Sequence, residues 1–197
     1  EGDGSSSHSI NGGKFGAGGY FNGTSSEVEI SSDVLNINTI SISAWININT
    51  TSGYRQIVSN YATGNYGWGF RVDDGGTLAY NTETVNVVSG STVLSTNTWY
   101  HAVVTIDSAG NSSKIYLNGI EDGSGTYTAP SYSGNTNFHI GSLGNINVQY
   151  FSGKIDQVRI FTKALSSSEV STLYAETAST VESLDPLSED TTDTLQV

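Results

Sequence analysis

The stretch that decides the fold runs from residue 39 to residue 48 and reads TISISAWINI. Apolar and polar residues alternate along it with a period of two, so each set of side chains points to its own face. This alternation is typical of a half-buried β-strand. The sequence therefore predicts a strand here, with its isoleucines facing a hydrophobic core.

Shorter strand-like segments lie on both sides of this stretch, and turn residues close each of them. The chain contains 23 glycines, which supply the backbone angles of tight turns, and only 13% of its residues are charged. Asn118-Gly119 suits the two-residue turn of a hairpin. We therefore expect an all-β protein. The expected strands lie at residues 18–21, 27–30, 56–61, 68–72, 78–81, 99–107, 114–117, 138–141 and 153–161.

One short helix is expected near the C-terminal end of the folded part. Ser166 and Glu169 form a capping box, in which each satisfies a backbone N–H group of the other. Val170, Leu173 and Tyr174 follow at the spacing of one apolar helix face, which would dock on a sheet.

Composition divides the chain into three parts. Residues 1–11 are polar and rich in Gly and Ser, which indicates a flexible lead. Residues 12–176 carry the strands and the helix and form one domain. Residues 177–197 are acidic and contain no basic residue, which is typical of a linker or tail that leaves the domain.

The charge balance excludes some classes of partner. Seven Lys and Arg residues against 19 Asp and Glu residues give a net charge of -12. Nucleic acid would be repelled, because its binding needs clustered cations.

The chain has no cysteine, which excludes disulfides and thiolate metal sites. No apolar run reaches the length of a membrane span, so we expect no membrane insertion.

Five motifs, in this order, resemble those of the laminin-G-like domains of bacterial surface proteins and phage tail fibres. They read GKFG at residues 13–16, ISAWI at 42–46, WYHAVVT at 99–105, KIYLNG at 114–119 and GKIDQVRIF at 153–161. The resemblance covers residues 12–175 and points to the concanavalin A-like lectin/glucanase superfamily. It implies a two-sheet antiparallel jelly-roll sandwich with one short C-terminal helix. The family usually has a further strand before GKFG, and residues 1–11 are a poor candidate for it.

The resemblance also implies a function. We expect a non-catalytic, lectin-like or adhesion module of a larger extracellular, cell-surface or virion protein, whose partners are a glycan or cell-surface polymer and neighbouring domains. A ligand-free structural repeat of a fibre is an alternative. A glycoside hydrolase or lyase is a second alternative. The sequence disfavours it, because the Glu-x-Asp-x-x-Glu run of the superfamily's enzymes is absent. Glu27 and Glu29 are expected to be solvated, on the face opposite Val28 and Ile30.

Aromatic and amide residues suggest where a sugar would bind. They cluster around the Gly/Asn turn, where loops on a rigid sandwich could form a binding rim. The alternative is that Trp68 belongs to the core and the tyrosines are half-buried strand residues. The candidate carbohydrate-binding residues are Tyr54, Arg55, Tyr61, Asn65, Tyr66 and Trp68.

Calcium is the expected cofactor, in a structural role, because the chain is rich in carboxylate and turn carbonyl oxygens. In similar jelly rolls the Asp of the closing strand is a calcium ligand, and Asp156 matches that position. Asn22 and Asp3 are further candidate ligands. A salt bridge or a turn-capping role for Asp156 is the alternative. His101 is expected to have a packing role, and His139 is expected to lie on the face opposite the core.

Overall fold

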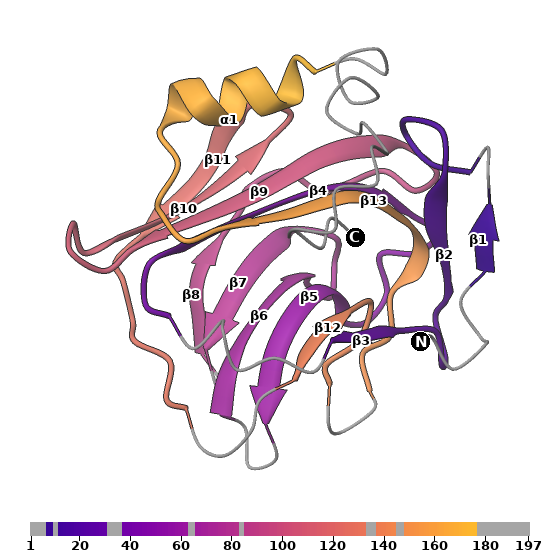
Figure 1. Ribbon diagram of the computed structural model, residues 1–197, viewed down its shortest axis with the longest axis horizontal. Helices are drawn as coiled ribbons and strands as arrows, with labels where there is room; N and C mark the ends of the chain where they lie inside the picture. Colours follow the sequence, from indigo (N-terminus) through magenta and orange to yellow (C-terminus); the bar gives the residue numbers. More distant parts are fainter. Residues whose placement is uncertain are drawn as a thin grey trace, which may run out of the picture.

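The computed structural model describes residues 7–9, 12–30, 37–62, 66–82, 85–132, 137–144 and 148–176. Two antiparallel sheets enclose one hydrophobic core, and a single helix, α1 (Ser167–Tyr174), lies on the outer face of one of them (Figure 1). The predicted two-sheet sandwich with one short helix is therefore confirmed. The predicted linker, residues 177–197, lies outside the described residues.

The seven-stranded sheet has the order β1-β2-β13-β4-β9-β10-β11. Its strands are β1 (Ser7–Ser9), β2 (Gly18–Asn22), β13 (Ser152–Phe161), β4 (Ile40–Ile48), β9 (Trp99–Asp107), β10 (Ser112–Leu117) and β11 (Ile120–Gly125). β1 lies inside the segment in which the sequence indicates no strand, and it pairs with β2. That expectation was wrong, because an edge strand of three residues needs backbone pairing rather than an apolar pattern.

The six-stranded sheet has the order β3-β12-β5-β6-β7-β8. Its strands are β3 (Val28–Ile30), β12 (Phe138–Ile140), β5 (Arg55–Ala62), β6 (Tyr66–Val72), β7 (Leu78–Thr82) and β8 (Val85–Ser89). β8 lies against β11 of the other sheet, where the carbonyl of Ser89 would be only 2.1 Å from a Cβ atom on Gly123. Glycine there lets the edges of the two sheets meet.

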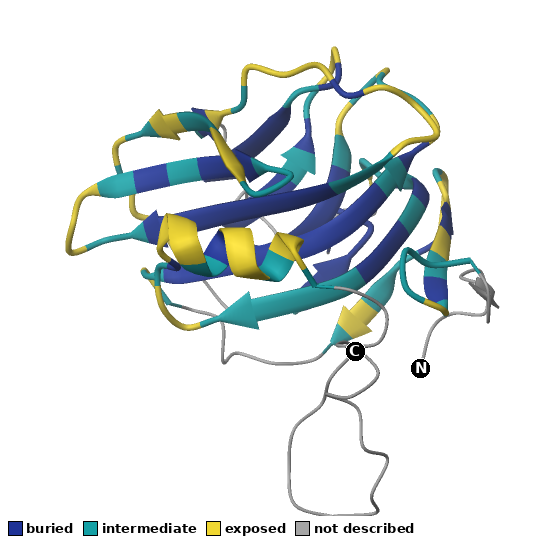
Figure 2. Ribbon diagram, turned by 90° about the horizontal axis from the view of Figure 1, so that it is seen from above, coloured by how far each residue is buried: buried dark blue, intermediate teal, exposed yellow. Residues whose placement is uncertain are grey.

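The stretch at residues 39–48 forms β4, at the centre of the seven-stranded sheet between β13 and β9. Ile42 and Ile46 face the core between the sheets, as predicted. The opposite face is also covered, since Ser43 and Trp45 are 3% and 5% exposed. β4 is therefore buried on both faces rather than half-buried, and Figure 2 shows buried residues along the long strands beside the exposed helix.

The outer face of β4 is covered by α1 and by the loop before β2. Tyr174 of α1 stacks on Trp45 with ring centroids 5.8 Å apart. From the loop, Phe15 meets the same ring edge-on at 5.7 Å, and the Lys14 ammonium lies 4.4 Å from its centroid. These contacts explain why an alternating strand has no solvated face.

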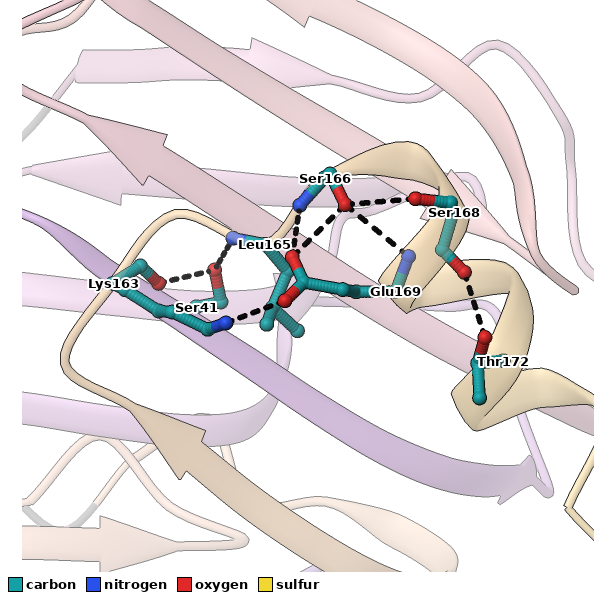
Figure 3. Close-up of polar contacts among 7 residues, drawn as sticks. All are labelled: Ser41, Lys163, Leu165, Ser166, Ser168, Glu169 and Thr172. Atoms are coloured by element: carbon teal, nitrogen blue, oxygen red, sulfur yellow. Dashed lines mark hydrogen bonds and ion pairs between the residues drawn. The ribbon is translucent and has the colours of Figure 1, made fainter.

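The capping box at the start of α1 is present (Figure 3). The Ser166 hydroxyl accepts from the Glu169 backbone N–H, and the Glu169 carboxylate accepts from the Ser166 backbone N–H. Ser41 of β4 ties the preceding loop to the sheet, because its hydroxyl donates to the Lys163 carbonyl and accepts from the Leu165 N–H. Among the helices of the described ranges, none is long and apolar enough to cross a membrane.

Candidate functional site

The six-stranded sheet has a polar outer face, which we define as the side chains of β5–β8 and β12 that point away from the core. Ser59 of β5 pairs with His139 on one side and with Gly69 on the other, and Gly69 pairs with Asn81. These residues alternate with core residues such as Phe70. His139 lies on this face, opposite Phe138 and Ile140, as the sequence predicts.

One end of this face carries an exposed aromatic ring supported by charged groups. Tyr54 is 44% exposed as a residue, and Arg71 Cζ lies over its ring, 4.3 Å from the centroid. Arg71 Nε donates to Asp73 Oδ1 at 2.6 Å, and its Nη2 donates to Asn86 Oδ1 at 2.9 Å. The Asn86 amide in turn donates to Asp73 Oδ2 at 2.7 Å. We call these four residues the Tyr54 platform.

Amide side chains adjoin the Tyr54 platform. Gln56, which pairs with Arg71 across β5 and β6, donates to Gln149 Oε1 at 2.9 Å. A Cβ atom on Gly69 would lie 2.7 Å from Gln56 Oε1 and 3.0 Å from Asn81 Oδ1, so glycine is required for the two amides to lie over the central strand. Gln149 and Asn86 remain accessible, while Gln56 and Asn81 are buried.

The other end of the outer face holds a buried hydrogen-bond network. The Glu27 carboxylate accepts from the Ser142 hydroxyl at 2.5 Å and lies 3.3 Å from His139 Nδ1. Ser59 donates to the Ser142 carbonyl at 2.9 Å. Glu29 is exposed as predicted, but Glu27 is held in this network rather than fully solvated. Ser142 binds Glu27 directly and not the imidazole, so these groups do not form a nucleophilic triad.

Two of the predicted carbohydrate-binding residues, Trp68 and Tyr61, are buried and not on the surface. Trp68 is fully buried and packs between Tyr80 and Phe138, so the alternative assignment to the core is correct and its ring cannot stack on a sugar. Tyr61 is 3% exposed, and its hydroxyl accepts from the Asn81 amide at 2.6 Å. The prediction that Trp68 and Tyr61 form part of a binding rim is therefore wrong, because both residues are buried.

The remaining candidates lie nearer the Tyr54 platform or outside the described side chains. Arg55 is half-buried, and it donates through Nε to the Ser52 carbonyl and through Nη1 to the Tyr150 carbonyl. Asn65 lies outside the described residues, and of Tyr66 only the backbone, in β6, is described. Among the predicted aromatic residues whose side chains the structure describes, Tyr54 presents its ring to solvent, whereas Tyr61 and Trp68 are buried.

Asp156 and Asn22, two of the predicted calcium ligands, accept hydrogen bonds from backbone N–H groups. Asp156 is 7% exposed, and its carboxylate accepts from the N–H groups of Lys14 at 2.7 Å, Phe15 at 3.0 Å and Gln157 at 2.8 Å. This is the turn-capping role, and it joins the GKFG motif to the closing strand. Such donors do not fit a cation, which needs oxygen ligands.

Asn22 has a similar local role. Its Oδ1 accepts from the N–H groups of Thr24, Ser25 and Ser26, which closes the turn after β2. Asp3 lies outside the described residues. Within the part of the chain that the structure describes, no three His, Cys, Asp or Glu side chains gather to hold a metal ion. Calcium binding stays a prediction.

Glu27 and Asp73, two carboxylates at opposite ends of the outer face, are widely spaced. A glycoside hydrolase needs two carboxyl groups roughly 5–9.5 Å apart. Glu27 lies beside His139, which is in register with Gly69 through Ser59. Asp73 comes four residues after Gly69, and at about 3.3 Å per residue this is about 13 Å along the strands. Glu27 and Asp73 are thus too far apart to act as a catalytic pair.

Comparison with known proteins finds one matching family. The family model described as the concanavalin A-like lectin/glucanases superfamily matches residues 22–171. No curated protein matches the chain.

Several solved structures share the fold. Domain 4 of AbnA, an extracellular arabinanase of Geobacillus stearothermophilus solved with arabinotriose, has a TM-score of 0.68 at 23% identity, over 87% of this chain and 82% of that one. The CBM40 of the Ruminococcus gnavus IT-sialidase, bound to α2,3-sialyllactose, has a TM-score of 0.68 at 12% identity, over 80% and 96%. A pentraxin of Limulus polyphemus reaches 0.58 at 18%, over 71% and 70%.

Proposed function

The chain belongs to the concanavalin A-like lectin/glucanases superfamily, and we propose that it is a non-catalytic carbohydrate-binding module that holds a glycan on the outer face of its six-stranded sheet. The Tyr54 platform is the proposed binding site. The proposal concerns the described domain, and its ligand is recognised by a stacking ring and by nearby hydrogen-bonding amides.

The exposed ring of Tyr54 carries the proposal. One face of the ring lies against Arg71, while 44% of the residue is accessible to solvent. A sugar ring has an apolar face of C–H groups that can pack on an aromatic face, and Tyr supplies such a face with few rotatable bonds. Because Arg71 is fixed by Asp73 and Asn86, the ring is held in place before a ligand arrives.

The accessible amides next to the ring supply the polar half of the site. Asn86 belongs to the Tyr54 platform, and Gln149 is anchored beside it through Gln56. An amide both donates and accepts, which matches the hydroxyl groups of a sugar. Ligand sites commonly combine an apolar contact surface with a few placed polar groups.

The comparisons support a binding module, in that two proteins of this fold are described with an oligosaccharide bound. The arabinanase domain is part of an extracellular enzyme. We propose by analogy that the present domain is a binding unit of a larger extracellular, cell-surface or virion protein. The wide spacing of Glu27 and Asp73 supports a non-catalytic role.

Screening on a glycan array, followed by polysaccharide pull-down with and without a chelator, tests the proposal. The expected result is selective retention on at least one glycan, without release of reducing sugar from it. Release of reducing sugar would show that the domain is a hydrolase and not a non-catalytic binding module. Binding to no glycan or polysaccharide would contradict the proposal and favour the structural repeat.

A further inference from the structure

We infer that the glycan bound at the Tyr54 platform is uncharged, and that sugars carrying a carboxylate or sulfate are rejected. The inference rests on the proposed carbohydrate-binding function and narrows its ligand class. It follows from how the structure uses the charge of Arg71, the cation of the Tyr54 platform.

Two N–H groups of Arg71, those of the Nε and Nη2 edge, are already committed within the protein. Its Nε bonds to Asp73 Oδ1, its Nη2 bonds to Asn86 Oδ1, and its Cζ lies over the Tyr54 ring. Arginine recognises an anionic group by presenting two parallel N–H donors to it. In this structure the fork formed by Nε and Nη2 is directed at Asp73 and Asn86, and the guanidinium, whose side chain is only 12% exposed, lies against the Tyr54 ring, so that fork is not presented to a ligand.

The ion pair is also sheltered from water. The side chains of Arg71 and Asp73 are only 12% and 15% exposed. An acidic sugar that displaced Asp73 from Arg71 would leave the Asp73 carboxylate partly desolvated beside the incoming anion. Breaking a sheltered ion pair in this way is costly, and like charges placed side by side add a repulsive term.

Among the residues that the structure describes around the Tyr54 platform, none supplies a replacement cation. Asp74 adjoins it, and its carboxylate accepts from the Gly53 N–H at 2.8 Å. Arg55, the neighbour of Tyr54 in the chain, directs two of its donors to the carbonyl oxygens of Ser52 and Tyr150. With a net charge of -12 over the whole chain, the long-range field also repels anions.

The test compares neutral and acidic ligands on the intact chain. The probes are neutral polysaccharides such as arabinan, galactan and β-glucan, and acidic ones such as polygalacturonate, heparin and polysialic acid. The wild type is expected to bind at least one neutral polymer, and every acidic polymer more than about tenfold more weakly. Affinity for the neutral polymer should not change with salt, because no ligand charge is screened.

A charge variant makes the test sharper. Asp73→Asn removes the carboxylate that neutralises Arg71 and is expected to raise the affinity for acidic polymers several-fold. Asp107→Asn makes the same change of net charge at the end of β9, where Asp107 accepts from the Gly110 N–H, and should leave the preference unchanged. Circular dichroism establishes that both variants are folded.

The outcomes separate the two proposals. Tight wild-type binding of an acidic polymer that is lost in Arg71→Gln would overturn the neutral-ligand inference and keep the carbohydrate-binding function. An equal gain in Asp73→Asn and Asp107→Asn would also overturn it, since net charge alone would then set the preference. Failure of the wild type to bind any polymer of either class would overturn the proposed function itself.

Discussion

Arg71 Cζ lies over the ring of Tyr54, 4.3 Å from the ring centroid. The contact joins a residue just before β5 to the outer face of β6, and Asp73 and Asn86 fix the guanidinium by accepting from its Nε and Nη2. A ring fixed before binding loses little conformational freedom when a ligand stacks on it. The proposed binding site therefore has a fixed ring, and the support that Arg71 gives can be tested separately from the ring itself.

Arg71→Lys tests that support. Lysine keeps the charge, but its single ammonium cannot hold Asp73 and Asn86 in the same plane while covering the Tyr54 ring. We expect glycan affinity to fall roughly three- to tenfold, with the free energy of unfolding changed by less than about 1 kcal/mol. Calorimetric titration gives the affinity, with Arg159→Lys in the seven-stranded sheet as the control. Equal affinities in the two variants would show that Arg71 does not support the site.

His101 makes stability depend on pH. It is 1% exposed, its Nε2 lies 2.8 Å from the Ser43 hydroxyl, and its ring packs against those of both Trp45 and Tyr174. Burial, and to a lesser extent the charge of Arg159, lower the pKa of His101 to about 4. In the unfolded chain the pKa is about 6.5, so between these values the unfolded state binds a proton that the folded state does not.

The free energy of unfolding should therefore fall as the pH decreases from 6.5 to about 4, by about 3 kcal/mol in total from this group. His101→Gln has no imidazole to titrate and should flatten this part of the profile, whatever its effect on stability at neutral pH. Urea unfolding at a series of pH values measures both profiles. Parallel profiles for the two proteins would rule His101 out as the cause.

Asp156 should be essential for the stability of the sandwich. Replacing it by alanine leaves the N–H groups of Lys14, Phe15 and Gln157 without their acceptor, in a largely buried setting. We expect Asp156→Ala to lower the free energy of unfolding by about 3 kcal/mol, against less than about 1 kcal/mol for Asp107→Ala, which removes a single acceptor from the exposed turn at Gly110. Similar losses in both variants would contradict the turn-capping role.

Thermal unfolding of the wild type and of Asp156→Ala, each with and without a chelator, tests the calcium prediction. If a structural calcium ion binds at Asp156, a chelator lowers the melting temperature of the wild type but not that of Asp156→Ala. An unchanged melting temperature of the wild type would contradict the calcium prediction and leave Asp156 its turn-capping role, in which backbone N–H groups contact its carboxylate.

Ser166 should stabilise α1 through its capping box. Ser166→Ala removes the acceptor for the Glu169 N–H and is expected to cost about 1 kcal/mol. Ser171→Ala replaces an exposed serine of the same helix and should be neutral or slightly stabilising, because alanine favours the helix. Thermal unfolding of the two variants compares them directly. A cost in Ser171→Ala as large as that in Ser166→Ala would contradict the capping account.

Local pattern predicted much of the fold. The alternation at residues 39–48 gave β4, and the capping box gave α1, because both signals depend on residues close in the chain. Trp68 shows the limit of composition. Its glycine-rich surroundings resemble a binding loop, yet Trp68, Phe70 and Val72 alternate into the core. Gly67 and Gly69 occupy the other face, so the period of two was the more informative signal.

The rest of the site depends on contacts that no local pattern contains. Asn86 reaches Arg71 because the register between β7 and β8 shifts between Tyr80 and Asn81. Similarly, Glu27 and Ser142 meet beside His139 although they are 115 residues apart. Sequence placed Tyr54 among the candidates, but the partners that fix its ring follow from sheet register, which only the folded chain defines.

The affinity of Tyr54→Ala for the preferred neutral glycan tests the central claim most directly. Tyr20→Ala is the matched control, since Tyr20 is 40% exposed but lies on β2 of the other sheet. If the glycan stacks on the Tyr54 platform, calorimetric titration should show Kd raised at least about tenfold in Tyr54→Ala and unchanged in Tyr20→Ala, with both variants as stable as the wild type. An unchanged Kd in Tyr54→Ala would contradict the account and place the binding surface elsewhere on the sandwich.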